Sequence, residues 1–228
     1  MNQRLGAAAG VAFVVLSFAS LALAPTPPGF DATAAEFVDW YQGSTAGIQA
    51  SGFLFGLDMV LAAVWFAYAR AHVDGDGGGS TFGPVATVGM AVMAVGWIMT
   101  GGISSAVAMR VDELDPGVVV LGAMLAGMAG MASQFGLALL AGGMAAQAQR
   151  AGSLPRWLVV VGWLAAATAL VSTVGMATDS DVVDLLLFAN WPPFVVWFVG
   201  VSVVLWRSGG TAPATAGAAA SDPVPVAG

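Results

Sequence analysis

The sequence predicts an all-α polytopic membrane protein in which six transmembrane helices form one bundle. The 228-residue chain is 58% hydrophobic and only 8% charged, whereas soluble domains usually carry about 25% charged residues. Six apolar runs approach or exceed the roughly 20 residues that a helix needs to cross a hydrocarbon core of about 30 Å. Lysine is absent, and five of the six arginines fall on alternate connections between the runs. The spans are expected at residues 5–24, 47–69, 84–109, 117–145, 156–177 and 183–206.

The first apolar run resembles a secretory signal peptide, because Ala22, Leu23 and Ala24 imitate a cleavage site. However, the run is longer than the 7–15 residues that such signals usually contain. Pro25 also follows the would-be scissile bond directly. We therefore expect an uncleaved first span.

Helix-start signals mark the connection that follows. Three prolines among residues 25–28 end the first span. Thr33 and Glu36 have the spacing of a capping box, in which each side chain bonds to the backbone amide of the other. Phe37, Trp40 and Tyr41 follow, and aromatic rings of this kind suit the membrane–water interface.

The charges predict the orientation of the chain. One side of the predicted membrane domain carries Arg4, Arg70, Arg150, Arg156 and Arg207, and the other carries only Arg110. An excess of Lys and Arg marks the cytoplasmic side, so both termini are expected in the cytoplasm and the protein in the plasma (inner) membrane. The opposite connections are acidic. Residues 1–207 form the predicted membrane domain, and residues 208–228, which lack apolar periodicity, form a predicted disordered tail.

Small residues are dense and often four apart. The pairs Gly6 and Gly10, and Gly52 and Gly56, match the GxxxG pattern, and Gly122 is followed by Ala126 four residues later. Such ridges let helix backbones approach closely. They are compatible with packing inside one bundle and with a dimer face.

Asp58 is the one ionisable residue deep in a predicted span. It precedes Arg70 by twelve residues, which places it about 18 Å from the cytoplasmic end of its helix and near the midplane. An ionised carboxylate there costs at least a few kcal/mol, so Asp58 must be protonated, paired or in a wet cavity. Counting along the other spans brings Gln134, Ser17 and Thr168 to a similar depth. The site is either a proton-coupling or substrate site, or a neutral acid in one interhelical hydrogen bond.

Asn190, Trp191, Pro192 and Pro193 interrupt the sixth span. The prolines remove two amide donors and push Trp191 out of helical geometry. We expect a helix end or a sharp kink here, with Asn190 capping the second part. Broken helices often carry transporter sites, and the alternative is an elbow at the outer surface with Trp191 as an interfacial anchor.

Composition excludes several mechanisms. Without cysteine there is no disulfide, thiolate nucleophile or Cys-ligated metal. A retinal Schiff base needs a lysine, and a bis-histidine haem needs more than the single His72. No cofactor, metal site or catalytic constellation is visible, and no basic patch supports nucleic-acid binding.

The overall pattern resembles an uncharacterised family of six-span bacterial membrane proteins that is common in actinobacteria. The matching parts, within about residues 5–207, are the proline-rich loop before Phe37, the start of the second span at 48–54, the acidic loop 112–115 and the segment 152–158. The resemblance implies a fold and a membrane, and it brings no activity and no site residues.

Three functions stay open. The first is a non-enzymatic bundle that packs with a lipid, a partner membrane protein or a second copy of itself. The second is a small proton-linked transporter that uses Asp58. The third is a membrane enzyme, for which the sequence offers no catalytic group. A wet cavity at Asp58 favours transport, and a dry, packed Asp58 favours a structural role.

Overall fold

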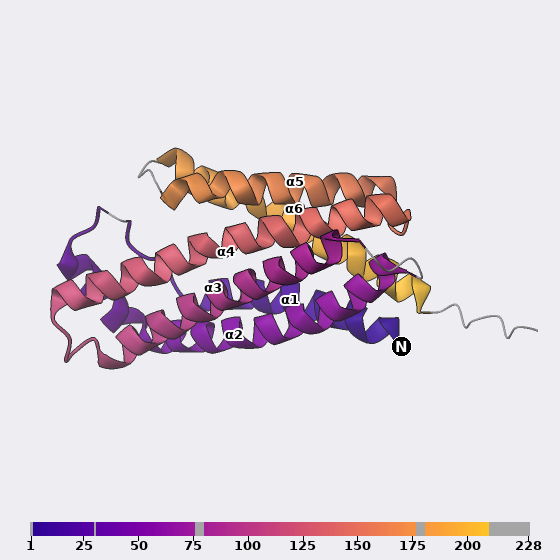
Figure 1. The fold of residues 1–228 in the computed structure, drawn as a ribbon. Helices are drawn as coiled ribbons and strands as arrows, with labels where there is room; N and C mark the ends of the chain where they lie inside the picture. Colours follow the sequence, from indigo (N-terminus) through magenta and orange to yellow (C-terminus); the bar gives the residue numbers. More distant parts are fainter. Residues whose placement is uncertain (1, 30, 76–79, 177–180, 210–228) are drawn as a thin grey trace, which may run out of the picture.

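The computed structural model describes residues 2–29, 31–75, 80–176 and 181–209, with the side chains of residues 175–188 left out. The predicted fold class is confirmed: the described chain forms one all-α bundle (Figure 1). Its elements are α1 (Gln3–Leu23), α2 (Ala34–Asp74), α3 (Phe82–Arg110), α4 (Pro116–Ala151), α5 (Arg156–Ser172), the 3₁₀ helix η1 (Thr173–Met176) and α6 (Asp181–Ser208). The predicted tail lies outside the described residues from residue 210 onward.

Consecutive helices pack against one another, and α6 closes the bundle by packing on both α5 and α1. The interior is crossed by contacts of α2 with α4 and α6. Among the described residues, five helices are long and apolar enough to cross a membrane, and in α6 the qualifying segment is Ala189–Ser208. The remaining helix, α5, has 17 residues, but its rise and that of η1 together amount to about 33 Å.

The capping box at the start of α2 is present as the sequence predicts. The backbone N–H of Thr33 donates to Glu36 Oε2 at 2.7 Å, and the N–H of Glu36 donates to Thr33 Oγ1 at 3.4 Å. The helix that begins here has 41 residues and includes the second predicted span. At 1.5 Å per residue α2 is about 61 Å long, roughly twice the thickness of the hydrocarbon core.

The extra length of α2 belongs to a second hydrophobic core at the acidic end. Phe37 and Tyr41 are buried there, with Val107 near the end of α3 and Val119 near the start of α4. Phe37 and Tyr41, two of the aromatic residues expected at the membrane–water interface, therefore pack against protein. The end of α3 and the start of α4 also reach this level, so the additional turns of α2 have neighbours to pack against.

The main core contains stacked aromatic side chains from three helices. Trp65 of α2 stacks on Phe198 of α6 with ring centroids 3.9 Å apart, and Phe13 of α1 lies 4.7 Å from the same ring. Trp65 Nε1 donates to Ser202 Oγ at 3.1 Å. These contacts bury Trp65 completely and fasten α6 to α1 and α2.

Backbone contact between α3 and α4 is the closest packing in the bundle. A Cβ placed on Gly136 would lie 2.2 Å from the backbone nitrogen of Met93 and 2.7 Å from the carbonyl oxygen of Gly89. Gly96 approaches the carbonyl of Ala129 in the same way. Gly89 and Gly96 of α3 are seven residues apart, as are Ala129 and Gly136 of α4, a period that keeps one face toward an antiparallel neighbour.

The GxxxG glycines also pack mostly inside the bundle. Gly6 faces Tyr68, Gly10 faces Trp65 and Gly52 faces the backbone of Gly101, whereas Gly56 faces open space.

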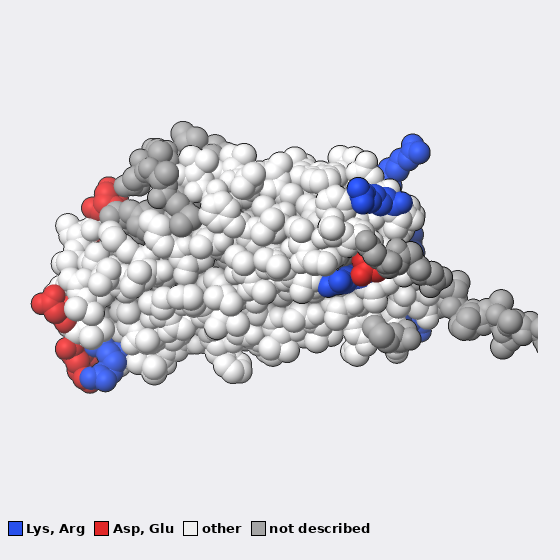
Figure 2. Space-filling view, viewed as in Figure 1, with Lys and Arg blue, Asp and Glu red and all other residues white. Residues whose placement is uncertain are grey.

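Charged side chains gather at the two ends of the bundle (Figure 2). At one end, Arg4 lies over the ring of Trp206 and Arg150 over the ring of Phe82, which joins α1 to α6 and α4 to α3. At the other end, Arg110 pairs with Glu113. The apolar belt between the ends is the surface that lipid covers.

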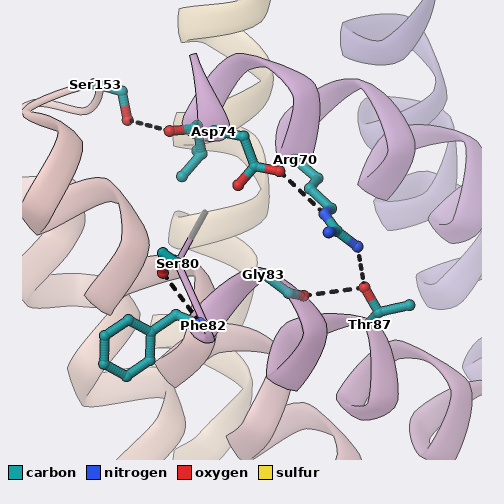
Figure 3. Close-up of polar contacts among 8 residues, drawn as sticks. Arg70, Asp74, Ser80, Phe82, Gly83, Thr87 and Ser153 are labelled. Carbon is teal, nitrogen blue, oxygen red and sulfur yellow. Dashed lines mark hydrogen bonds and ion pairs between the residues drawn. The ribbon is translucent and has the colours of Figure 1, made fainter. Parts of the chain in front are cut away.

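A hydrogen-bond network fixes the arginine end (Figure 3). Arg70 Nε donates to Asp74 Oδ2 at 3.1 Å, and its guanidinium also donates to Thr87 Oγ1 on α3. Ser153, in the turn between α4 and α5, donates through Oγ to the carbonyl oxygen of Val73 at 3.3 Å. These bonds connect α2 to α3 and to the turn between α4 and α5.

We predict that Gly136→Ala destabilises the bundle by about 1–3 kcal/mol, because the added methyl group must push α3 away from α4. Gly102→Ala is the control: a Cβ there meets no atom within 4 Å, so this variant should be as stable as the wild type or gain up to about 1 kcal/mol of helix propensity. Thermal unfolding in detergent measures both. Equal stability of the two variants would contradict the backbone contact.

Candidate functional site

A small cavity lies in the interior between α1, α2, α3, α4 and α6, with a volume of about 30 Å³. Its polar lining consists of Ser17, Asp58, Gln134 and Asn190, and the rest of its wall is aromatic or aliphatic. A site of this size holds one or two water molecules when polar groups line it. The cavity is therefore wettable, yet too small for an organic molecule.

Asp58 is the ionisable group of this site and is only 1% exposed. Its Oδ2 lies 3.0 Å from Ser17 Oγ, while Oδ1 is buried without a hydrogen-bond partner among the described residues. Ser17 Oγ also lies 2.9 Å from the carbonyl oxygen of Phe13.

Ser17 has one hydroxyl proton for these two acceptors. If Asp58 is protonated on Oδ2, it can donate to Ser17 while Ser17 donates to the carbonyl of Phe13, and both bonds form. If Asp58 is ionised, one of the two acceptors goes without the proton, and the negative charge needs another partner. The hydrogen bonds therefore fit a neutral Asp58, or an ionised one that is paired with a cation in the cavity.

Two amide side chains form the opposite wall. Asn190 Nδ2 donates to Gln134 Oε1 at 2.7 Å, and Thr168 Oγ1 lies 2.9 Å from Asn190 Oδ1. Thr168 Oγ1 is also 2.9 Å from the carbonyl oxygen of Leu164. This chain of hydrogen bonds ties α4, α5 and α6 together at the depth of Asp58.

The structure brings the candidate polar residues to one place. Ser17, Asp58 and Gln134 line the cavity, and Thr168 reaches it through Asn190. Sequence reasoning missed the role of Asn190, which it assigned to a helix cap near the outer surface. The missed signal is periodicity, because Asn190, Phe194 and Trp197 lie on one buried stripe of α6.

Of the two alternatives expected at Pro192 and Pro193, the helix end does not occur. Both prolines lie inside α6, which runs as one helix from Asp181 to Ser208. The prolines remove the amides that would bond to the carbonyls of Phe188 and Ala189, one turn earlier.

Trp191 is held by protein contacts. Its ring lies 6.0 Å from Phe18, 6.1 Å from Phe194 and 6.5 Å from Trp97 between centroids. It also lines the cavity.

Fold and cavity together define a multi-pass helical membrane bundle with a polar site in its interior. No family model, no curated protein and no solved structure matches this chain. The class therefore follows from the helices and the cavity alone.

We predict that Asp58→Asn leaves stability within about 0.5 kcal/mol of the wild type, because the amide keeps the shape and still bonds with Ser17. Asp58→Leu should cost about 1 kcal/mol, the scale of an interhelical hydrogen bond in a membrane protein. Urea or thermal unfolding in mixed micelles measures the stability of both variants and of the wild type. A leucine variant as stable as the asparagine variant would show that the Ser17 contact contributes nothing.

Proposed function

We propose that the protein is a non-enzymatic bundle of the bacterial inner membrane that accommodates another hydrophobic molecule along its apolar surface. The observation that carries this proposal is an open groove of about 590 Å³ between α3 and α4. Its lining is entirely apolar, with four alanine or glycine residues among nine: Ala91, Val92, Val95, Gly96, Met99, Leu125, Met128, Ala129 and Ala132.

The groove follows from the close packing of the two helices. Gly96 and Ala129 bring the backbones together, so the floor of the groove carries only small side chains. Val95 and Leu125, which are more than half exposed, form its edges. An acyl chain fits such a furrow, and so does a ridge of a partner helix or of a second copy, because small residues permit close approach.

Filling the groove tests this function. Ala91→Trp places a large ring over the floor and should remove the lipid or protein that remains bound after gentle detergent extraction, as read by native mass spectrometry. Val160→Trp on α5 is the matched control, because Val160 is 65% exposed outside the groove. The proposal fails if both variants keep the same bound species as the wild type, or if the wild type carries none.

The orientation is part of the proposal, with both termini in the cytoplasm. The segregation of arginines from acids along the bundle supports it. A periplasm-active reporter fused after Arg207 should give no signal, and one fused after Asp115 should give a strong signal. The reverse pattern would overturn the orientation. The resemblance to the six-span actinobacterial family belongs to this proposal as well.

A second candidate is proton-linked transport through Asp58, and the free Oδ1 in a wettable cavity favours it. The cavity volume limits the cargo in this conformation to a proton or a small ion. This candidate uses different residues from the groove, so each can fail without the other.

A further inference from the structure

We propose that the cavity at Asp58 is a binding site for a monovalent cation of the size of Na⁺, which replaces the proton of the Asp58 carboxyl. The exchange is balanced: the protonated acid takes up one cation, releases one proton and becomes a carboxylate–cation pair. The site does not depend on the lipid groove proposed above.

The first argument is charge. A buried carboxylate needs a counter-charge, and in the described structure the lining of this cavity contains no cationic side chain. Arg70 lies about 18 Å farther along α2 and is already paired with Asp74. A mobile monovalent ion neutralises a single carboxylate. A divalent ion would need more than one negatively charged ligand, and the described residues contain no cluster of three acidic or histidine side chains.

The second argument is the supply of oxygen ligands, which hard cations prefer. Asp58 lines the cavity and its Oδ1 has no hydrogen-bond partner among the described residues, while Ser17 Oγ lies beside its other oxygen.

The third argument concerns the amides of Gln134 and Asn190, whose hydrogen bonds can run in either direction. Thr168 can use its one proton for the carbonyl oxygen of Leu164 and accept from Asn190 instead. With both amides turned over, Gln134 donates to Asn190 and keeps its own oxygen free for the cavity. One direction thus leaves an N–H group of Gln134 for the cavity, and the other leaves an oxygen for a cation.

Proton and cation compete for one group. The residues that line the cavity come from α1, α2, α3, α4 and α6, and Asp58 is the one titratable side chain among them. From α5, the neutral Thr168 reaches the site through Asn190. Each bound ion releases one proton, so below the pH at which Asp58 takes up its proton the apparent Na⁺ affinity should fall tenfold per pH unit.

Thermal unfolding of the purified full-length protein tests the site, with NaCl compared against choline chloride at equal ionic strength. At a hundredfold excess over its Kd, Na⁺ should raise Tm by roughly 5–10 °C, and the rise should shrink as the pH is lowered. Binding of radioactive ²²Na⁺ should saturate at one ion per chain.

Three variants make the test specific. Asp58→Asn should abolish the Na⁺ response, and Gln134→Leu should weaken the affinity at least tenfold. Asp112→Asn changes a carboxylate at the acidic end and should respond like the wild type.

The proposal is overturned if the wild type shows no Na⁺-dependent shift, including the case in which Tm depends on pH alone. It is equally overturned if Asp58→Asn keeps the shift, or if Gln134→Leu binds Na⁺ as tightly as the wild type. Should Asp58→Asn fail to fold, the ²²Na⁺ measurement on the wild type and the Gln134→Leu comparison still decide the matter.

Discussion

Direct contact between the backbones of α3 and α4 is the constraint on which the rest of the structure depends. Gly136 rests against Met93 with no room for a side chain between them, and this contact fixes the rotation of both helices. Met93 and Leu137 consequently turn into the interior as walls of the cavity, and Gln134 faces Asn190. The same contact leaves the shallow furrow on the opposite, lipid-facing side of the pair.

The interior polar site follows from the scarcity of water in a bilayer. Each buried polar group must find a partner within the protein, because the hydrocarbon supplies none. Ser17, Thr168, Gln134 and Asn190 satisfy one another or nearby carbonyls across four helices. Among the polar residues of this site Asp58 is the exception, since one of its oxygens has no partner among the described residues. Because this oxygen has no partner, the cavity offers a polar group to a ligand and is not simply a gap in the packing.

Sequence reasoning predicted the depth of residues better than their rotation. A helix rises by a fixed 1.5 Å per residue, so the distance to a terminal arginine placed Asp58, Ser17 and Gln134 at one level. No comparable marker fixes which way a residue faces in a span that is apolar all round. The glycine contact of α3 with α4 was therefore not singled out among 31 glycines. Asn190 was misplaced for another reason: Pro192 and Pro193 indicated a break near the outer surface, although α6 continues through both.

The length of α2 shows a second limit. The second span was expected to begin at residue 47, whereas the helix begins at Ala34 and continues through that position. Local propensity is a weak prior that tertiary packing overrides. Here the partners are the end of α3 and the start of α4, and Gln42 donates to Asp112 across that junction at 2.8 Å. The helix continues because Phe37 and Tyr41 pack into the second hydrophobic core.

The separation of charge along the bundle has a consequence for how copies of the protein meet. Two copies side by side in a bilayer are parallel, so their acidic ends repel each other. In detergent nothing enforces this orientation, and an antiparallel pair sets arginine end against acidic end. The attraction reaches about 30 Å at 0.01 M salt and about 8 Å at 0.15 M. An assembly seen in micelles at low ionic strength is thus electrostatically biased toward an arrangement that no membrane contains.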